Sequence, residues 1–415
     1  MMLQGAVGII AFVLLAWLIS ENRGQVRFTT PLIGIGLQFA LAVVFLKSPG
    51  SIQFFKMLNR VILAIETATN AGTSFVFGYL GGSTSPSPFD ITNPQATFIL
   101  AFQALPIILI MSALSSLLFY WRVLPAMVNA FSWLLGKVTG IGGAEGVGLA
   151  SNIFLGMVES PLLIRPYLKT MTRSELFSVM TCGLAGIAGT VMALYASFLS
   201  KVLPEAMGHI LTASVISVPA SITIAKIMIP ETGSITDGKV VPSQNARSSM
   251  DAITLGTIEG VQLLINIVAM LIVLVALVYM ANLGLSFLPW SDGNPLTLQR
   301  LLGYLMAPVV WLMGIPWSES VTAGTLMGTK SILNELLAYV EMARLPEGAL
   351  SSKSLVIMTY ALCGFANPGS LGIMIGGMGT MVPERRDEIV SLGVRSVVAG
   401  TMATCMTGAV IGLIV

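Results

Sequence analysis

Long hydrophobic stretches with few or no charges set the main constraint on this sequence. A helix needs about 20 predominantly apolar residues to cross the hydrocarbon core of a bilayer. Eight stretches come close to that requirement, at residues 3–20, 31–46, 97–121, 176–199, 210–228, 261–288, 355–381 and 389–415. The sequence therefore predicts an all-α polytopic membrane protein with eight transmembrane helices.

Composition supports this fold class and excludes several kinds of function. Only 10% of the residues are charged, whereas a soluble domain averages about 25%. The formal net charge of +2 gives no sign of nucleic-acid binding. Three cysteines without a Cys-x-x-Cys pair argue against a disulfide framework and against a metal site. We therefore expect one integral membrane domain over residues 1–415, embedded in the lipid bilayer.

The sequence offers neither a catalytic set nor a signal peptide. No Ser/His/Asp arrangement can be built around the single histidine, His209, so we do not expect an enzyme. The apolar N-terminus lacks a basic region and a small-residue cleavage site. Residues 3–20 are therefore interpreted as the first membrane helix.

Positive charges in the loops indicate an orientation. Cytoplasmic loops of membrane proteins are enriched in Lys and Arg. With both termini outside, the loops after the first, third and fifth spans and before the last span fall on one side. They carry Arg23, Arg27, Arg122, Lys239, Arg247, Arg385 and Arg386, joined by Arg165 and Lys169 if residues 152–168 form a re-entrant hairpin.

Two hydrophobic segments do not fit simple spans. Residues 143–168 and 301–340 are interrupted near their middle by Gly, Pro and Glu. The first contains FLGMVESPLL and is followed by TCGLAGIAGTVM, and the second contains LMGIPWSESV and is followed by LCGFANPGSLGIM. Paired interrupted segments point to the binding site of a secondary transporter, because unpaired backbone groups survive at membrane depth only beside a cavity or a bound solute.

Glu159 and Glu319, one in each interrupted segment, are the first candidates for solute contact. A charged side chain at membrane depth costs roughly 2.5–3.5 kcal/mol or more and is usually retained for function. Either glutamate can accept hydrogen bonds from a polar, neutral solute, carry a coupling proton, or cap a broken helix. The sequence leaves these alternatives open.

Another group of polar residues lies where a later span is broken. Pro368 interrupts residues 355–381. Around it, Phe365 offers a face for stacking, and Asn367 and Ser370 offer hydrogen-bond donors and acceptors. An alternative is that Asn367 only satisfies the broken backbone.

A third polar group follows the second interrupted segment. Lys330, Asn334 and Glu335 lie within one predicted helical stretch. Lys330 and Asn334 are four residues apart and face the same way on a helix. We interpret this group as a cluster that stabilises the helix.

In these motifs the chain resembles the concentrative nucleoside transporter family. The resemblance covers essentially the whole sequence and is sharpest at NIFLGMVESPLLIRPYL, GLAGIAGTVMALYA, APVVWLMGIPWSES, GTKSILNELLAY and LCGFANPGSLGIMIGG. It implies a homotrimer that moves nucleosides inward with a cation, usually sodium and in some members protons. It also implies two re-entrant hairpins in an inverted repeat. The scaffold domain would comprise approximately residues 1–121 and 251–290, and the mobile transport domain approximately residues 122–229 and 295–415.

The resemblance also implies two binding sites, carried over residue by residue. Contacts to the nucleobase would come from Met157, Val158, Glu159 and Val191. The ribose would meet Glu319, and the second broken span would contribute Phe365, Asn367 and Ser370. Sodium would be held, largely by backbone carbonyls, at Asn152, Leu155, Gly186 and Ile187. No cofactor other than the coupling ion is implied.

Three places depart from the commoner family pattern. Met157 and Val158 stand where the family often has Gln-Thr, which removes two hydrogen-bonding groups near the base. Gly186 replaces a serine of the sodium site, so one hydroxyl ligand is lost while the carbonyl remains. Pro368 and Gly369 replace a Phe-Ser pair and keep the helix broken without the ring and the hydroxyl.

Together these features predict a secondary active transporter of the bacterial inner membrane. It would import nucleosides by symport with a cation, sodium being favoured, through an alternating-access mechanism. The alternative is a proton-coupled symporter of nucleosides or a related solute, with Glu159 or Glu319 as the proton carrier. A channel is disfavoured, because the charge-poor spans supply no continuous polar pore lining.

Overall fold

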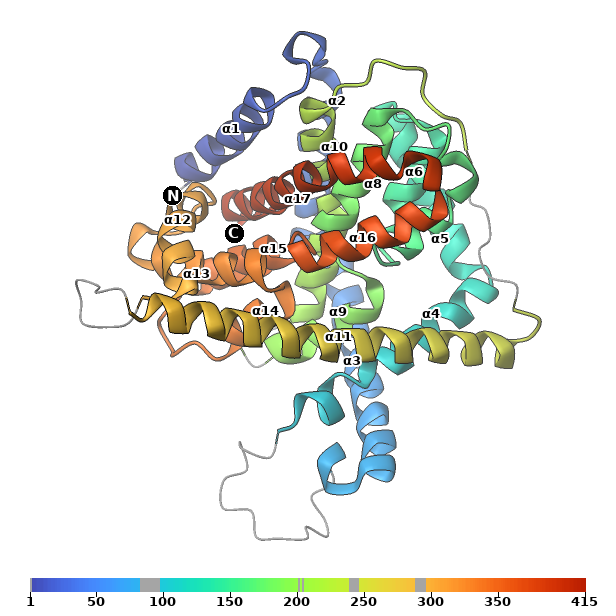
Figure 1. Cartoon of the computed structure of the whole chain (residues 1–415), viewed down its shortest axis with the longest axis vertical. Coiled ribbons are helices and arrows are strands. Elements are labelled where there is room, and N and C mark those ends of the chain that lie inside the picture. The colour runs from blue at the N-terminus through green and yellow to red at the C-terminus, as the bar shows by residue number, and fades with distance from the viewer. Residues whose placement is uncertain (1, 83–97, 201, 204, 239–245, 288–295) are drawn as a thin grey trace.

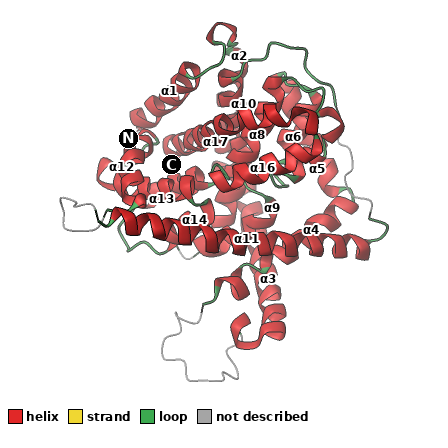
Figure 2. Ribbon diagram, in the orientation of Figure 1, coloured by secondary structure: helices red, strands yellow, loops and turns green. Residues whose placement is uncertain are grey.

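The computed structural model describes residues 2–82, 98–200, 202–203, 205–238, 246–287 and 296–415. Every regular element within these ranges is helical, and the helices pack into a bundle crossed on one face by the long helix α11 (Ser249–Leu285) (Figure 1; Figure 2). The predicted all-α membrane fold is therefore confirmed. Residues 97, 239 and 288, which the predictions included, lie outside the described ranges.

The number of spans differs from the predicted eight. Within the described residues, six helical segments are long and apolar enough to cross a membrane, and a bent pair brings the number to seven. The predicted first span is α1 (Met2–Leu18), which has only 17 residues. The predicted span at 355–381 is divided into α15 (Ser352–Leu362) and α16 (Pro368–Met381), because Pro368 opens a new helix.

Helix α10 (Ala206–Met228) forms the centre of the bundle, and 94% of its apolar window is buried. The helices that pack against it include α2 (Thr29–Lys47), α8 (Arg173–Ala185), α9 (Gly189–Leu199) and α17 (Arg386–Ile414). A helix enclosed in this way must satisfy its own polar side chains. The hydroxyls of Thr212, Ser221 and Thr223 do so by donating to carbonyls four residues earlier, at 2.6–2.8 Å.

Helix α11 is much less enclosed, with 11% of its apolar window buried. It packs along α4 (Ile107–Tyr120), where a Cβ built on Gly256 would lie 2.6 Å from the Ser112 carbonyl oxygen. Such close approach through small residues is typical of membrane helix pairs. Helix α11 also contacts α12 (Leu298–Leu312), whereas α3 (Pro49–Phe77) and α5 (Val123–Thr139) contact α4.

Two structural units with the same order of elements make up most of the bundle. In each unit, two helices separated by a break precede a broken span and a long helix. The first unit comprises α6 (Gly143–Ser151), α7 (Glu159–Leu162), α8, α9 and α10. The second comprises α13 (Trp317–Ile332), α14 (Glu335–Ala343), α15, α16 and α17. The sequence predicted this repeat, although with a different register in the second unit.

The register differs because the sequence contains two interruptions in its second half. The one predicted as a hairpin break, near Glu319, is a 117° bend between α12 and α13. The break that matches the first unit lies at Leu333 and Asn334, between α13 and α14. Glu335 is thus the counterpart of Glu159, since each is the first residue of the helix after its break. The bend misled the prediction because its Gly-Ile-Pro sequence has the composition of a hairpin break.

A charged cluster joins both units to the segment after α1. Arg173, at the start of α8, donates to the two carboxylate oxygens of Glu21 at 2.8 and 3.1 Å and to Glu388 of α17 at 3.4 Å. Arg395 also pairs with Glu21, and Arg385 pairs with Glu388. The hydrogen bonds from Arg173 hold the pKa of Glu21 below its usual value, so this carboxylate is ionised near neutral pH.

Replacing Glu21 by glutamine should make stability less dependent on pH. The ionised Glu21 contributes stability above the unfolded-state pKa, and this contribution is lost as the pH falls through the lower folded-state pKa. We expect Glu21→Gln to lower the free energy of unfolding by about 1 kcal/mol at neutral pH, since the cluster is partly exposed. Thermal unfolding in detergent at a series of pH values measures this difference, which should shrink as the pH is lowered. A deficit that stays constant with pH, or an equal deficit in Glu347→Gln, would contradict the assignment.

Candidate solute-binding site

A cavity of about 440 Å³, called the central cavity below, lies where the two units face the middle of α11. In Figure 1, α9, α14 and α16 lie beside this part of α11. Small-molecule sites have volumes of roughly 300–1,000 Å³. Most of the lining is apolar, and the polar side chains in it are Glu159, Tyr195, Asn266, Asn334, Glu335, Asn367 and Ser370.

One wall of the central cavity is the break between α6 and α7. The carboxylate of Glu159 folds back over Gly156, where a Cβ would lie 2.1 Å from the Glu159 Oε2 atom. Backbone N–H groups of this turn, including those of Gly156 and Val158, face the same carboxylate. Met157 and Val158 add apolar surface. This wall therefore presents one anchored carboxylate among apolar side chains.

A second carboxylate, that of Glu335, lies at the start of α14. It accepts hydrogen bonds from the Tyr195 hydroxyl at 2.6 Å and from Asn367 Nδ2 at 3.4 Å. The side chain of Asn334 caps α14 by accepting from the Leu337 N–H at 3.0 Å, which fixes the first turn that carries Glu335. Only 4% of Glu335 is exposed. The carboxylate is therefore held in place while one part of it lines the cavity.

The two broken spans cross at their breaks, beside Glu335. The Phe365 N–H donates to the Gly186 carbonyl at 3.2 Å. A Cβ built on Gly364 would lie 2.9 Å from the Ala185 carbonyl oxygen, so only glycine permits this approach. Beyond the break, Asn367 caps α16 by accepting from the Ser370 N–H at 2.8 Å. The crossing thus points Phe365, Asn367 and Ser370 toward one cavity.

The structure brings together seven of the eight residues predicted for the substrate site. All seven line the central cavity: Met157, Val158, Glu159, Val191, Phe365, Asn367 and Ser370. Their contact with a solute remains a prediction.

Glu319 is the residue that the structure separates from the others. It lies in the first turn of α13, outside the lining of the central cavity. Its Oε2 atom accepts from the backbone N–H of Ser351 at 3.1 Å and from the Ser351 hydroxyl at 3.2 Å. Ser351 is the N-cap residue of α15, so Glu319 supports a helix start. This corresponds to the capping alternative that the sequence had left open.

Glu335, Tyr195 and Asn266 line the cavity although the sequence did not single them out for solute contact. For Glu335 a signal existed, because Asn334 before it is a typical N-cap residue. The number of residues between a glutamate and the following Cys-Gly pair gives a second signal. The interval from Glu335 to Cys363 is closer to the interval from Glu159 to Cys182 than the longer interval from Glu319 to Cys363 is. Tyr195 follows Val191 by one helical turn and faces the same way.

Lys330, which the sequence grouped with Glu335, has a different task. Its ammonium group is fully buried and donates to the Ala361 carbonyl at 2.7 Å and to the Thr404 hydroxyl at 2.9 Å. Ala361 lies in the last turn of α15, whose carbonyls have no partner within the helix. Lys330 therefore stabilises the broken end of α15. The predicted cluster within one helix is wrong, because the break at Leu333 and Asn334 places Lys330 and Glu335 on different helices.

Two of the residues predicted for sodium, Asn152 and Gly186, meet at the broken span formed by α8 and α9. Asn152 Nδ2 donates to the Cys182 carbonyl at 2.7 Å, in the last turn of α8. A Cβ built on Gly186 would lie 2.6 Å from Asn152 Nδ2, so glycine here leaves room for the amide. Ile187 is buried in the same break, and Leu155 lies in the break after α6. Unwound backbone carbonyls and an amide oxygen are ligands that suit sodium in transporters.

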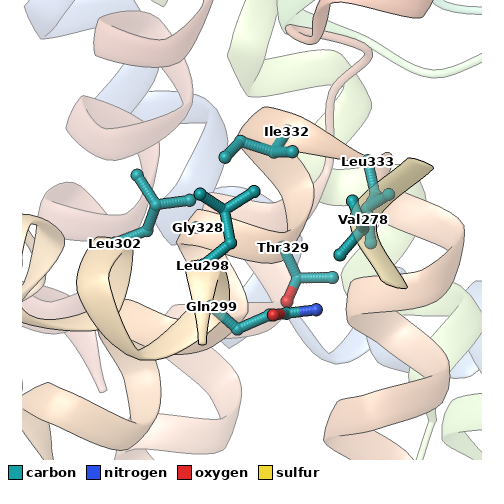
Figure 3. Close-up of a pocket in the computed structure, with 8 residues that line it drawn as sticks. All are labelled: Val278, Leu298, Gln299, Leu302, Gly328, Thr329, Ile332 and Leu333. Carbon is teal, nitrogen blue, oxygen red and sulfur yellow. The ribbon is translucent and has the colours of Figure 1, made fainter. Parts of the chain in front are cut away.

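A second crevice, between α11, α12 and α13, is shown in Figure 3. It has no room even for a water molecule. Its polar groups already have partners, since the Thr329 hydroxyl donates to Glu341 at 2.8 Å and Gln299 Oε1 accepts from Asn282 at 3.1 Å. It is not a solute site.

Three family profiles match consecutive parts of the chain. Residues 7–80 match "Na+ dependent nucleoside transporter N-terminus", residues 101–202 match "Nucleoside recognition", and residues 209–412 match "Na+ dependent nucleoside transporter C-terminus". The matches include both structural units.

Individual relatives agree over the full chain. An uncharacterized transporter of Haemophilus influenzae is 35% identical over 100% of this chain and 98% of its own length. The nucleoside permease NupC of Helicobacter pylori is 33% identical over 100% of this chain and 98% of its own length. Human solute carrier family 28 member 3 is 35% identical over 98% of this chain, which spans 59% of the human protein.

Solved structures show the same fold. CNTnw in an inward-facing substrate-bound state has a TM-score of 0.89 and 34% identity, over 99% of this chain and 98% of its own. A CNTnw variant in an outward-facing state also has a TM-score of 0.89, with 33% identity over 99% of this chain and 97% of its own.

The crossing of the broken spans should be sensitive to one added methyl group. In Gly364→Ala the new Cβ meets the Ala185 carbonyl and the Thr404 methyl group at 2.9 and 2.8 Å. We expect a loss of about 1–3 kcal/mol in the free energy of unfolding, the usual cost of overpacking. The matched control is Gly376→Ala in α16, where nothing lies within 4 Å of the added atom. Equal melting temperatures for the two variants in detergent would show that the crossing is not tightly packed.

Proposed function

Because the chain belongs to the concentrative nucleoside transporter family, we propose that it imports nucleosides through the central cavity by symport with a cation. Its relatives are transporters and not enzymes. The mechanism we propose is alternating access, in which the loaded cavity opens first to one side of the membrane and then to the other.

The observation that carries this proposal is the carboxylate of Glu335 in a mostly apolar cavity. An ionised carboxylate has about four lone-pair positions. Tyr195 and Asn367 use two of them. The others can accept hydrogen bonds from two neighbouring hydroxyls, as a ribose presents them. A sugar hydroxyl also finds polar groups in Asn367 and Ser370, beside Glu335.

The rest of the cavity suits a planar base. Met157, Val158 and Val191 offer apolar surface, and the ring of Phe365 offers a face for stacking. Glu159 lies on the same wall as Met157 and can meet a polar edge of the base. A solute with a hydroxyl-rich end and a flat, less polar end therefore matches the cavity along its length.

Glu335 should matter far more for binding than Glu319. In Glu335→Gln the charge-assisted hydrogen bonds to the ribose are weakened, which we expect to reduce uridine and adenosine affinity by about 10- to 100-fold. Glu319→Gln should change it by less than about twofold, because Glu319 supports α15 outside the cavity. Equilibrium binding of radiolabelled nucleosides to the purified protein measures both.

A nucleoside without the two ribose hydroxyls supplies a further check. The 2′,3′-dideoxy form of uridine should bind the wild type and Glu335→Gln with similar, weak affinity. If Glu335→Gln and Glu319→Gln weakened uridine binding equally, the ribose assignment of Glu335 would be wrong.

We infer that the two structural units move as one transport domain. The Phe365–Gly186 hydrogen bond and the Arg173–Glu388 pair connect them. The predicted division, with residues 1–121 and 251–290 as scaffold and 122–229 and 295–415 as transport domain, keeps these contacts within the moving part. CNTnw has been solved in inward-facing and outward-facing states, which supports such a movement here.

Sodium is the coupling ion that we favour. The descriptions of two matching family profiles support it, as does the contact of Asn152 with the break at Gly186. Bound sodium at this break would hold the first hairpin against α8 and so favour nucleoside binding, and by linkage the nucleoside would favour sodium equally. The alternative is proton coupling through Glu159. Glu335 replaces Glu319 as the second candidate for a proton carrier, because it lies in the cavity.

Imposed ion gradients across proteoliposomes distinguish the two. We expect a sodium gradient to drive uridine accumulation, and Asn152→Ala to raise the sodium concentration needed for half-maximal uptake by about tenfold, since one oxygen ligand is lost. Thr254→Ala, on the exposed side of α11, is the control. Accumulation that is driven only by protons and is indifferent to Asn152→Ala would assign the coupling to a carboxylate.

For the assembly we propose a homotrimer in the bacterial inner membrane with both termini outside. The exposed apolar side chains along α11, such as Ile265, Ile272 and Leu277, support a surface that meets lipid or another copy. The lysines and arginines predicted on one side of the membrane support the orientation.

A further inference from the structure

Asn266 brings an amide from α11 to the wall of the central cavity. Among the six long apolar helices that the structure describes, α11 has the highest mean hydropathy, 2.9. The Asn266 side chain has no hydrogen-bond partner in the described part of the chain. A polar side chain at membrane depth is costly to keep without a partner. An amide in this helix, open to the cavity, therefore calls for a partner inside the cavity.

The position of Asn266 on α11 is set by helical spacing. The cavity-lining residues of this helix include Leu263, Asn266, Ile267, Met270 and Leu274. Intervals of three and four residues place them on one face of a helix. Asn266 thus has apolar neighbours on both sides of it along the cavity wall.

A contact on this face shows which part of the cavity Asn266 meets. Met270 Cε lies 3.3 Å from a Cβ built on Gly369, next to the Asn367–Ser370 end. With a rise of 1.5 Å per residue, Asn266 is about 6 Å along the axis from Met270. It therefore lines the cavity about one helical turn away from the residue that contacts the ribose end.

The first hairpin brings few hydrogen-bonding side chains to the cavity. Met157 and Val158 carry no hydrogen-bonding side-chain groups suited to a base, so the first hairpin contributes only the Glu159 carboxylate. A carboxylate accepts hydrogen bonds when ionised and leaves the acceptors of a base without a donor. The amide of Asn266 provides both a donor and an acceptor, the combination that pairs with the edge of a nucleobase.

We propose that Asn266 is a specificity-determining residue whose amide hydrogen-bonds the polar edge of the nucleobase from the α11 side of the cavity. The proposal rests on the proposed function, since it presupposes a nucleoside in the central cavity. A bound nucleoside then touches the two structural units through both its ribose and its base, and α11 through its base. Recognition of the base then depends partly on a helix outside those units.

The test compares two ligands with two variants of the full-length protein in detergent. Asn266→Leu replaces the amide by an apolar group of similar size. Gln262→Leu removes an amide from the same helix at a position that does not line the cavity. The ligands are adenosine and a riboside in which a phenyl ring replaces the base. We expect Asn266→Leu to weaken adenosine binding by about tenfold, because a hydrogen-bonded group of the base loses its partner. Phenyl riboside binding should change by less than about twofold, and Gln262→Leu should affect neither ligand.

Each outcome decides for or against the proposal. No loss of adenosine affinity in Asn266→Leu would overturn the proposal. An equal loss for both ligands would also overturn it, because it would indicate a changed cavity shape and not a lost hydrogen bond to the base. If Asn266→Leu does not melt like the wild type, Asn266→Ser is measured in its place with the same expectation. Glu335→Gln should weaken the binding of both ligands. It therefore separates the proposed ribose contact of Glu335 from the proposed base contact of Asn266. A wild type that binds neither ligand contradicts the nucleoside site itself, whereas normal binding with an inert Asn266 contradicts only this inference.

Discussion

The hydrogen bond from the Phe365 N–H to the Gly186 carbonyl is the contact on which the rest of the site depends. It joins two membrane spans at the points where each is broken. Breaks leave backbone groups without partners, and a bilayer has no water to satisfy them. Crossing the two breaks lets one supply an acceptor for the other, and the absence of a side chain at Gly364 makes the approach possible.

In each unit a side chain also donates to a backbone carbonyl at the end of a broken span, and the two units use different side chains for this. In the first, the Asn152 amide donates to the Cys182 carbonyl in the last turn of α8. In the second, the Lys330 ammonium donates to the Ala361 carbonyl in the last turn of α15. In both units a side chain of the hairpin thus satisfies the end of the broken span. The breaks are therefore fixed before any solute binds, and the side chains that follow them have defined positions.

Sequence patterns predicted much of this arrangement. Hydrophobic runs gave the all-helical membrane class, because their length and lack of charge admit few other folds. Helix breakers and polar residues at membrane depth identified Glu159, Asn367 and Ser370, which the structure brings to one cavity. These residues share a local signal, namely a break that the sequence itself displays.

The predictions failed where the information is not local. Glu319 and Glu335 both follow an interruption, and composition does not distinguish a bend between two helices from a hairpin break. Asn266 has no break beside it, and only the packing of α11 against the cavity reveals its position. The eight predicted spans included a short helix and a divided one, because a hydropathy pattern does not reveal where the backbone of a helix is broken.

The central claim is that one cavity, with Glu335 at one end and Glu159 at the other, holds a nucleoside. The most direct test is an experimental structure of the wild-type protein in lipid nanodiscs with saturating uridine. The account predicts density for the ribose against Glu335 and Asn367, and for the base beside Met157 and Asn266. Uridine density elsewhere in the protein, or lipid filling the cavity while uridine is bound, would contradict it.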